Sequence, residues 1–330
     1  MELFCIGGTR FVGRHIVERW LDAGDEVTLY NRGRHRSPFE GIDRVSHERG
    51  DRADEARLRQ ALETAAPDVV VDTVAYQPAE VALATSLCRR LDIERYVYIS
   101  SGAAYGEERV PKREGETALE PWPGETPTEA VDATYGQRKA QGDRLVAAAA
   151  ADGLGAMSVR PPVIYGPYDY TERFDYWLGR VLAHERVVVP GDGASLWHRA
   201  YAEDVASAVR VVARRGEPGE AYNVGDEHAP TMAEWVELIA AAADRAVAPV
   251  ATGVQTLATV GLNAAAFPGY RARPHLLALE KLRALGWRST PHEEGLAATL
   301  SEYRQTDRDE RDIGPARRET ERALAQLESG

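Results

Sequence analysis

The stretch Leu3 to Gly13, LFCIGGTRFVG, limits what this 330-residue chain can fold into more than any other part of it. An apolar run ends abruptly at Gly7 and Gly8, and a helical pattern of apolar residues begins at Phe11. Glycine permits positive φ and a close approach of the backbone to a ligand, and a new helix offers unpaired N–H groups and a positive dipole end to a phosphate. The pattern therefore predicts a strand, a tight turn and a helix that bind the pyrophosphate of a dinucleotide.

The glycine motif is incomplete, because Gly7 and Gly13 hold its outer positions while Arg10 replaces the middle glycine. Taken alone, it is also compatible with an ordinary strand-to-helix turn. The next segment favours the dinucleotide site, since Glu26 to Tyr30, EVTLY, is typical of a second strand and completes a β-α-β unit of about 30 residues.

Strand and helix patterns keep alternating through the first half of the chain. Strands are predicted near residues 45–48, 68–74, 96–100 and 156–160, and helices over 54–65, from Pro78 onward and over 135–151. This alternation predicts an α/β fold, a Rossmann-type doubly wound parallel sheet with right-handed crossovers. Ligands of such sheets bind at the carboxyl ends of the strands.

The second half of the chain has a less regular pattern. Residues 106–133 are typical of a long surface loop, and further helices are predicted near 174–184, 204–214, 232–243 and 275–285. We expect a dinucleotide-binding domain of residues 1–165 with a returning segment of about 198–225. A smaller C-terminal substrate-binding lobe would comprise about 166–197 and 226–303.

The charged tail 304–330 is expected to form a solvated helix, with a partner-binding arm or a partly disordered segment as the alternatives.

Composition excludes several classes of protein. The net charge of −12 and the pI near 5.3 argue against a nucleic-acid or membrane partner, although a local basic groove is not excluded by them. The chain has only three lysines, so its positive charge is almost all arginine, which suits a salty cytoplasm or reflects GC-rich coding.

Cys5 and Cys88 lie in apolar contexts and are predicted to be free core residues in a reducing compartment. Without a signal peptide or an apolar run of membrane-spanning length, we expect a cytoplasmic protein.

Tyr135 and Lys139 are four residues apart at the start of the helix predicted over 135–151, so their side chains share one face. A tyrosine that takes a proton from an alcohol must act as phenolate, and lowering its pKa of about 10 by about 3 requires roughly 4 kcal/mol. A nearby ammonium supplies charge of the right sign. Ser101, at the end of the predicted strand YVYIS, is placed to hydrogen-bond the reacting oxygen. The alternative is an exposed Tyr-Lys pair and a turn-forming serine.

Taken together, IGGTRFVG, SSGAAYG, YGQRK, RPPVIYGP, AYAEDVA and HEEGLAATLSEY resemble the extended short-chain dehydrogenase/reductase family, also called NAD-dependent epimerases/dehydratases. The likeness covers nearly the whole chain up to about residue 303, and the motifs occur in family order. GGTRFVG and DYTERFDYW are most similar to an atypical branch whose members are labelled isoflavone reductase-like, sugar dehydratase-like or RNA-binding. Branch membership therefore implies little about the substrate.

The resemblance implies a set of site residues. The catalytic ones are Ser101, Tyr135 and Lys139, and no metal is expected. The residues implied to bind the cofactor are Gly7, Gly8, Thr9, Arg10, Phe11, Val12, Gly13, Asn31, Arg32, Asp51, Arg52, Val74, Ala75, Ser100, Tyr135, Lys139, Pro161, Pro162 and Val163. Among these, Asp51 and Arg52 would contact the adenine, although Asp51 is equally suited to a turn or helix cap. The candidate substrate contacts are Tyr76, Gly102, Ala103, Arg199 and Arg271.

Two departures from the family pattern bear on chemistry. Members that prefer NAD usually carry an acid at the end of the second strand, whereas this chain has Asn31 followed by Arg32, which favours NADP over NAD. Dehydratases carry Asp-Glu just after the catalytic hydroxyl, whereas this chain has Gly102 and Ala103, which disfavours dehydration.

Two further departures concern the substrate. Many nucleotide-sugar members have an asparagine where this chain has Val163 and an arginine where it has Trp197. Arg199, Arg271 or Arg273 are candidates to bind a diphosphate instead, with surface salt bridges as the simpler account of each.

The predicted function is therefore NAD(P)-dependent oxidation and reduction, or epimerisation, of a sugar or nucleotide-sugar by a homodimer. Two alternatives remain: a carbonyl reductase of the isoflavone reductase-like kind that acts on another substrate, and a non-catalytic nucleotide-binding or RNA-associated protein. Salt-sensitive RNA binding would favour the last of these.

Overall fold

The computed structural model of the chain describes residues 1–124, 132–306 and 313–329. The chain forms two compact units. The first unit contains Met1–Pro162, Ala202–Gly225 and Leu277–Ser289, and the second contains Val163–Tyr201, Asp226–Leu276 and Thr290–Gly330. No helix in the described ranges is both long and apolar enough to cross a membrane.

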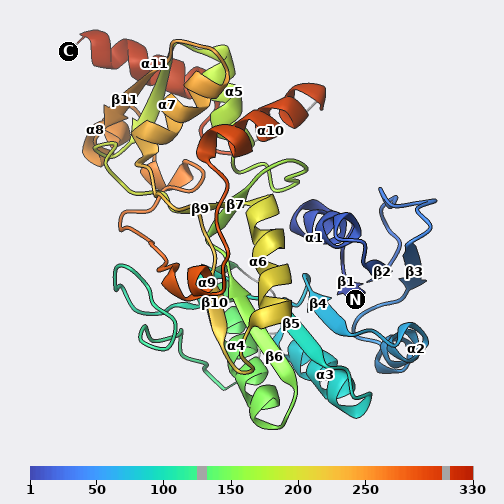
Figure 1. Cartoon of the computed structure of the whole chain (residues 1–330). Coiled ribbons are helices and arrows are strands. Elements are labelled where there is room, and N and C mark those ends of the chain that lie inside the picture. The colour runs from blue at the N-terminus through green and yellow to red at the C-terminus, as the bar shows by residue number, and fades with distance from the viewer. Residues whose placement is uncertain (125–131, 307–312, 330) are drawn as a thin grey trace. The chain divides into compact units, whose positions relative to one another are not determined.

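A seven-stranded, fully parallel sheet forms the centre of the first unit (Figure 1). Its order is β3-β2-β1-β4-β5-β6-β10. The strands are β1 (Glu2–Ile6), β2 (Glu26–Asn31), β3 (Val45–Arg49), β4 (Val69–Asp72), β5 (Arg95–Ile99), β6 (Gly155–Arg160) and β10 (Ala221–Asn223). The strand order reverses at β1, which pairs with β2 on one edge and β4 on the other, and ligands of open α/β sheets bind at such a switch point. The predicted doubly wound fold is confirmed.

Helices cover both faces of this sheet. On one face, apolar residues of α2 (Glu55–Ala65), α3 (Pro78–Arg90) and α4 (Tyr135–Ala151) form one cluster with Phe4 and Ile6 of β1. On the other face, α1 (Phe11–Asp22) packs against α6 (Ala202–Arg215) (Figure 1). Because successive strand side chains point to opposite faces, a strand buried on both sides needs an unbroken apolar run, as in the VVV of β4.

Helix starts follow local capping chemistry. Pro78 occupies the first turn of α3, where its missing N–H costs nothing, and the Glu80 side chain accepts from the N–H of the N-cap residue Gln77 at 2.8 Å. The side chain of Asp54 accepts a hydrogen bond from the Arg57 N–H at the start of α2. The bounds predicted for the helix over 135–151 agree with α4.

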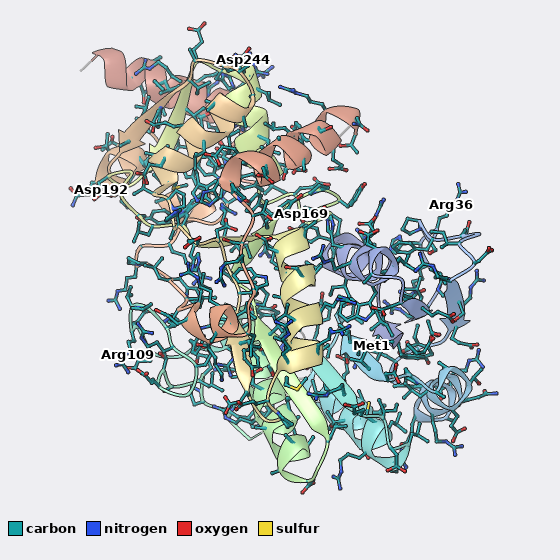
Figure 2. The ribbon with its side chains drawn as sticks, in the orientation of Figure 1. Met1, Arg36, Arg109, Asp169, Asp192 and Asp244 are labelled. Atoms are coloured by element: carbon teal, nitrogen blue, oxygen red, sulfur yellow. The ribbon has the colours of Figure 1, made fainter. Side chains whose placement is uncertain are left out.

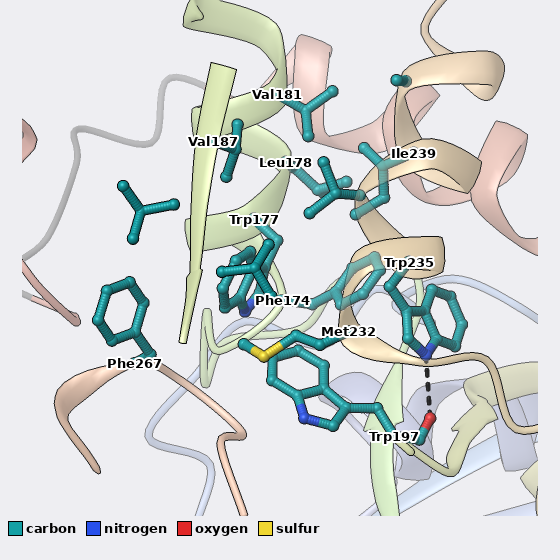
Figure 3. Packing of buried hydrophobic residues seen from close by; sticks show 14 of the residues in the cluster. Phe174, Trp177, Leu178, Val181, Val187, Trp197, Met232, Trp235, Ile239 and Phe267 are labelled. Atoms are coloured by element: carbon teal, nitrogen blue, oxygen red, sulfur yellow. Dashed lines mark hydrogen bonds between the residues drawn. The ribbon is translucent and has the colours of Figure 1, made fainter. Parts of the chain in front are cut away.

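The second unit contains two small parallel sheets and five α-helices among its described residues. One sheet pairs β7 (Val163–Tyr165) with β9 (Arg199–Tyr201), and the other pairs β8 (Arg186–Pro190) with β11 (Ala248–Thr252). The helices are α5 (Asp175–Ala183), α7 (Met232–Ala242), α8 (Val254–Thr259), α10 (His292–Gln305) and α11 (Arg317–Ser329). Large aromatic side chains fill the core of this unit, and the Trp235 indole N–H donates to the Trp197 carbonyl (Figure 3).

Several expectations about the second half differ from the structure. The helix expected near 275–285 is limited to the short α9 (Glu280–Ala284). Its segment, Leu277–Ser289, groups with the first unit rather than with the lobe expected for it. The Asn223 side-chain amide donates to the Ala278 carbonyl, and the Trp287 indole N–H donates to Ser207 of α6 at 2.9 Å. These long-range bonds leave no local sequence signal.

The loop and the tail also differ from their predictions. Lys112 and Thr117 are buried, so the loop expected over 106–133 is only partly a surface loop, and its residues 125–131 lie outside the described ranges. In the tail, α11 packs against β8, and Ala323 is fully buried. The tail helix is therefore only partly solvated. Cys5 and Cys88 are buried free thiols, as predicted.

Candidate active site

The turn between β1 and α1 has the close packing expected of a phosphate-binding loop. Gly7 has φ of +110°, and a Cβ there would lie 2.2 Å from the Thr73 Oγ1 atom. A Cβ at Gly13, in the first turn of α1, would lie 2.9 Å from the Gly8 backbone nitrogen. Only glycine lets these backbones approach so closely. The turn brings the N-terminus of α1 to the carboxyl end of β1, where backbone N–H groups suit a pyrophosphate.

Asn31, at the carboxyl end of β2, is held in place by its neighbours. Its amide nitrogen donates to the Gly7 carbonyl at 3.2 Å, and its amide oxygen accepts from the Gly33 N–H at 2.9 Å. A ring nitrogen of His47 lies 3.1 Å from the same oxygen. The uncharged side chain therefore ties the glycine turn to the end of β2 and to His47 of β3.

Basic side chains gather around this strand end. Arg10 Nη1 lies 3.3 Å from His35 Nε2, and both side chains are exposed. Arg32 and Arg34 are exposed on the loop after β2, and Arg36 extends from the same loop (Figure 2). A cluster of this kind suits an additional phosphate at the 2′-position of an adenine ribose.

Asp51 and Arg52 follow β3 but have different surroundings. Asp51 is exposed, and its carboxylate accepts from the Ala53 N–H at 3.0 Å, which is the turn geometry of the alternative role. The Arg52 guanidinium instead donates to both carboxylate oxygens of Asp72, at 2.6 and 2.7 Å. This buried pair was not predicted from the sequence. Its only sequence signal is an acid at the end of the otherwise apolar strand β4.

Lys139 has its ammonium inside the first unit, at the carboxyl ends of β4 and β5. The side chain is 3% exposed, and Nζ donates to the carbonyls of Ala75 and Ile99 at 2.9 and 2.8 Å. Burial lowers the lysine pKa to about 8 against the opposing effect of the Asp72 carboxylate. The ammonium thus keeps one N–H beyond the two donated to these carbonyls.

Tyr135 shares a face of α4 with Lys139, as predicted. Lys139 Nζ lies 5.8 Å from the centre of the Tyr135 ring, and also 4.8 Å from the Tyr98 ring and 5.2 Å from the Tyr76 ring. At about 6 Å and an effective dielectric constant of about 20, two unit charges interact by about 3 kcal/mol. An ammonium at such a distance would favour a negative charge on the Tyr135 phenol.

Ser101 lies just after β5, at the entry to the 3₁₀ turn η1 (Gly102–Ala104). Its hydroxyl accepts from the Ala103 N–H at 3.1 Å, and the Gly102 N–H donates to the Pro161 carbonyl at 2.7 Å. The start of α4 packs against this turn, because a Cβ on Gly136 would lie 2.4 Å from the Ala103 carbonyl oxygen. Gly136 therefore permits the close approach that brings the Tyr135 end of α4 to the Ser101 turn.

Replacing Gly136 with alanine is expected to lower the free energy of unfolding by about 1–3 kcal/mol, because the new methyl group must displace a backbone carbonyl. Urea unfolding measures this effect. Gln137→Ala, at the next position of α4, is the matched control and should stay within about 0.5 kcal/mol of the wild type. Equal stability of both variants would contradict the close approach.

The remaining predicted substrate residues have unlike environments. Tyr76 is exposed, whereas Arg199 of the second unit is 2% exposed. Its guanidinium carbon lies 4.6 Å from the Trp197 ring and 4.8 Å from the Phe174 ring, and burial lowers the Arg199 pKa to about 10. Arg199 Nε and Nη1 have no hydrogen-bond partner among the described residues. Arg271 is exposed.

A buried polar network in the first unit was not foreseen from the sequence. Arg160, at the end of β6, donates to Asp143 of α4 at 2.8 Å and to the Tyr105 hydroxyl at 3.0 Å. The Tyr105 hydroxyl donates to the Asn223 side chain at 2.9 Å, and Asn223 also holds the carbonyl of Lys112. The network links α4 to the loop that follows Ser101.

Comparisons with known proteins agree on the family. The model of the NAD-dependent epimerase/dehydratase family matches residues 3–225. The chain is 23% identical to dTDP-glucose 4,6-dehydratase of Escherichia coli over 92% of this chain and 93% of that protein. It is 25% identical to the chloroplast stem-loop binding protein of 41 kDa b of Arabidopsis thaliana over 68% of this chain, and spans 59% of that protein's length.

Solved structures show the same fold. The dTDP-glucose 4,6-dehydratase of Bacillus anthracis, solved in complex with NAD, superposes with a TM-score of 0.73 at 20% identity and covers 93% of this chain and 97% of its own. The UDP-glucose 4-epimerase of Thermus thermophilus, also solved with NAD, gives a TM-score of 0.69 at 25% identity over 92% of this chain and 99% of its own. Together with the glycine turn and the Ser-Tyr-Lys arrangement, these matches show that the chain belongs to the NAD-dependent epimerase/dehydratase family.

Proposed function

We propose that this protein is an NAD(P)-dependent oxidoreductase or epimerase that acts on a hydroxyl or carbonyl group of a sugar or nucleotide-sugar. The observation that carries the proposal is the buried Lys139 ammonium, held by two carbonyls and 5.8 Å from the Tyr135 ring centre. A fully buried cation is costly and is retained where it performs a task. Relatives named as dTDP-glucose dehydratases and UDP-glucose epimerases support a nucleotide-sugar as the substrate class.

The glycine turn fits a dinucleotide, because both Gly7 and Gly13 lie where a Cβ would collide with neighbouring atoms. The pyrophosphate would lie on the N-terminus of α1, and Lys139 would donate its remaining proton to a ribose hydroxyl. The chemistry that a bound nicotinamide supplies is exchange of a hydride with the substrate carbon.

Tyr135 would then move the proton that accompanies this exchange. When the substrate is an alcohol, the phenolate oxygen takes the hydroxyl proton as the C–O bond becomes a carbonyl, and the reverse step returns it. The nearby Lys139 ammonium would favour the phenolate form that this task requires. The Ser101 hydroxyl would donate to the reacting oxygen and hold it in place.

The outcome depends on what happens to the carbonyl compound. If it is retained and reduced from its other face, the net reaction is epimerisation, and if it leaves, the enzyme is a dehydrogenase or reductase. Dehydration fits this chain less well, because Gly102 and Ala103 of η1 carry no acid or base.

Arg199 is our candidate for recognising an anionic part of the substrate. Two donor nitrogens of its buried guanidinium have no partner among the described residues, which suits a charge-assisted hydrogen bond to an anion.

The test begins with calorimetric titration of the protein with NAD and with NADP. The same samples are then mixed with a panel of sugars and nucleotide-sugars, with absorbance recorded at the reduced-nicotinamide band and products separated by chromatography. Substrate-dependent reduction indicates a dehydrogenase, and a new epimer without net absorbance change indicates an epimerase. No binding of either dinucleotide would refute the proposal.

We further propose that NADP is the preferred cofactor, on the basis of Asn31 and the basic cluster around it. Arg32→Glu should weaken NADP binding about 10- to 100-fold, as expected for a charge-assisted hydrogen bond to the 2′-phosphate, and leave NAD binding nearly unchanged. Arg36→Glu changes the charge of the same loop equally and is the control, since Arg36 lies 3.3 Å from Glu40. Equal losses for NAD and NADP in the Arg32 variant would contradict the preference.

A further inference from the structure

The segment between β4 and α3, Thr73 to Gln77, is held by two carboxylates. Asp72 Oδ1 accepts from the Val74 N–H at 3.2 Å. Glu80 Oε2 accepts from the N–H groups of Tyr76 and Gln77, at 2.7 and 2.8 Å. Three of the backbone N–H groups in this short segment therefore depend on the positions of two acidic side chains.

One cation joins these two carboxylates. The Arg52 guanidinium donates to both Asp72 oxygens and to the Glu80 carbonyl at 3.1 Å, and its Nε lies 3.5 Å from Glu80 Oε1. The side chain of Arg52 is 10% exposed and that of Asp72 is fully buried. The Tyr96 hydroxyl donates to Asp72 Oδ2 at 3.1 Å. A bidentate pair of this kind fixes orientation as well as distance, and a point charge such as lysine does not.

The segment in turn holds the catalytic lysine. The Ala75 carbonyl, in the middle of it, accepts a hydrogen bond from Lys139 Nζ at 2.9 Å. The second carbonyl on Nζ, that of Ile99, belongs to the end of the regular strand β5 and does not rely on the segment. The placement of the ammonium between its two acceptors thus depends on where residues 73–77 lie.

We propose that Arg52 is a positioning residue of the candidate active site: by joining Asp72 to Glu80 it fixes the Ala75 carbonyl and, through it, the Lys139 ammonium. This proposal rests on the proposed function, because the role of Lys139 in catalysis is part of that function. Arg52 lies at the adenine end of the predicted cofactor site and Lys139 at the chemical end, so the pair with Asp72 connects the two.

The same residues set the charge around the ammonium. Three rings lie 4.8 to 5.8 Å from Nζ, those of Tyr76, Tyr98 and Tyr135. The charged groups that act on the ammonium are Arg52 after β3, Asp72 of β4, Glu80 of α3 and Asp143 of α4. Burial has the largest effect and lowers the Lys139 pKa, and the Asp72 carboxylate has the next largest and raises it. Asp143 and Glu80 also raise the pKa, whereas Arg52 lowers it. Removing the charge of Asp72 must therefore lower the pKa of Lys139 further.

The small number of lysines makes a direct measurement possible. Protein grown with lysine carrying ¹³C at Cε gives three lysine signals, from Lys112, Lys139 and Lys281. Lys112→Arg and Lys281→Arg assign two of them and leave the third to Lys139. A pH titration by NMR then reports the Lys139 pKa in the protein without substrate or cofactor. Hydrogen exchange of the peptide that contains residues 73–77 reports on the segment itself.

In Asp72→Asn, the Lys139 pKa is expected to fall by about 1, because an opposite charge that raises this pKa is lost, and exchange of the segment amides should speed up at least tenfold. Arg52→Lys keeps the positive charge but loses the two-bond contact with Asp72. Exchange of the segment amides should therefore speed up, while the Lys139 pKa changes by less than about 0.5. The double variant Arg52→Gln with Asp72→Asn leaves no unpaired buried charge and serves if Asp72→Asn does not fold. The Lys139 pKa of this double variant should also fall, because Asp72 raises that pKa more than Arg52 lowers it.

Asp25→Asn is the matched control, because it removes the carboxylate partner of Arg210 in the same unit, at 3.0 Å, with the Asp25 side chain 9% exposed. Asp25 is not among the groups with the largest effects on the Lys139 pKa, so this variant should lose stability with little change in the lysine titration or in the exchange of residues 73–77. An unchanged Lys139 titration and unchanged exchange in the folded Asp72 variants would overturn the proposal. Absence of dinucleotide binding together with the expected lysine shift would instead refute only the proposed function.

Discussion

Replacing Tyr135 with phenylalanine is expected to lower kcat for the substrate that the panel identifies by about 10²- to 10⁴-fold, the usual contribution of general acid–base catalysis. The variant loses only the phenolic oxygen, so α4 keeps its packing. Cofactor affinity should therefore remain within about threefold, as measured by the same calorimetric titration. The loss should appear in kcat, because the proton is moved only as the C–O bond changes.

Tyr222→Phe is the matched control for this prediction. Tyr222 is also buried in the first unit, on β10, and its hydroxyl accepts from the Glu217 N–H at 2.8 Å, so the variant loses one phenolic oxygen from a residue with no proposed part in proton transfer. Its kcat should stay within about threefold of the wild-type value. Full activity in the Tyr135 variant, or an equal loss in both variants, would show that Tyr135 is not the acid–base group.

The largest expected effect on stability comes from Arg160→Ala, which should lower the free energy of unfolding by about 3–5 kcal/mol. The side chains of Arg160 and Asp143 are 7% and 3% exposed, so the substitution leaves a buried carboxylate without its cation. It also removes the donor to the Tyr105 hydroxyl. Urea unfolding followed by tryptophan fluorescence measures the change.

Arg89→Ala provides the comparison for this effect. Arg89 pairs with Asp152 at 2.7 Å in the same unit, yet both side chains are about half exposed. Removing such a surface pair should cost less than about 1 kcal/mol. If the Arg160 and Arg89 variants lost similar stability, burial would not be what makes the Arg160 network important. Adding Asp143→Leu to Arg160→Met should recover much of the loss, because no unpaired charge then remains.

The local chemistry of the sequence was sufficient for the fold class and for part of the site. Apolar strands separated by amphipathic helices predicted the doubly wound sheet, and glycines at residues 7, 8 and 13 predicted the turn at the start of α1. The spacing of Tyr135 and Lys139 predicted a shared helix face, since residues four apart lie on one side of a helix. Each of these features depends on residues close together in the chain, so a single sequence contains enough information to predict it.

The partners of the site residues depend on contacts between distant segments. The carbonyl acceptors of Lys139 lie 64 and 40 residues away in the chain, and Arg52 meets Asp72 across 20 residues. Residues 277–289 join the first unit through bonds to Asn223 and Ser207, and a lysine in a loop expected at the surface is buried. Periodicity shows which face of an element is apolar, but not which element will cover it. Only the tertiary structure decides the strand order of the sheet. That order brings these groups together and so determines how deeply they are buried and which charged groups lie near them.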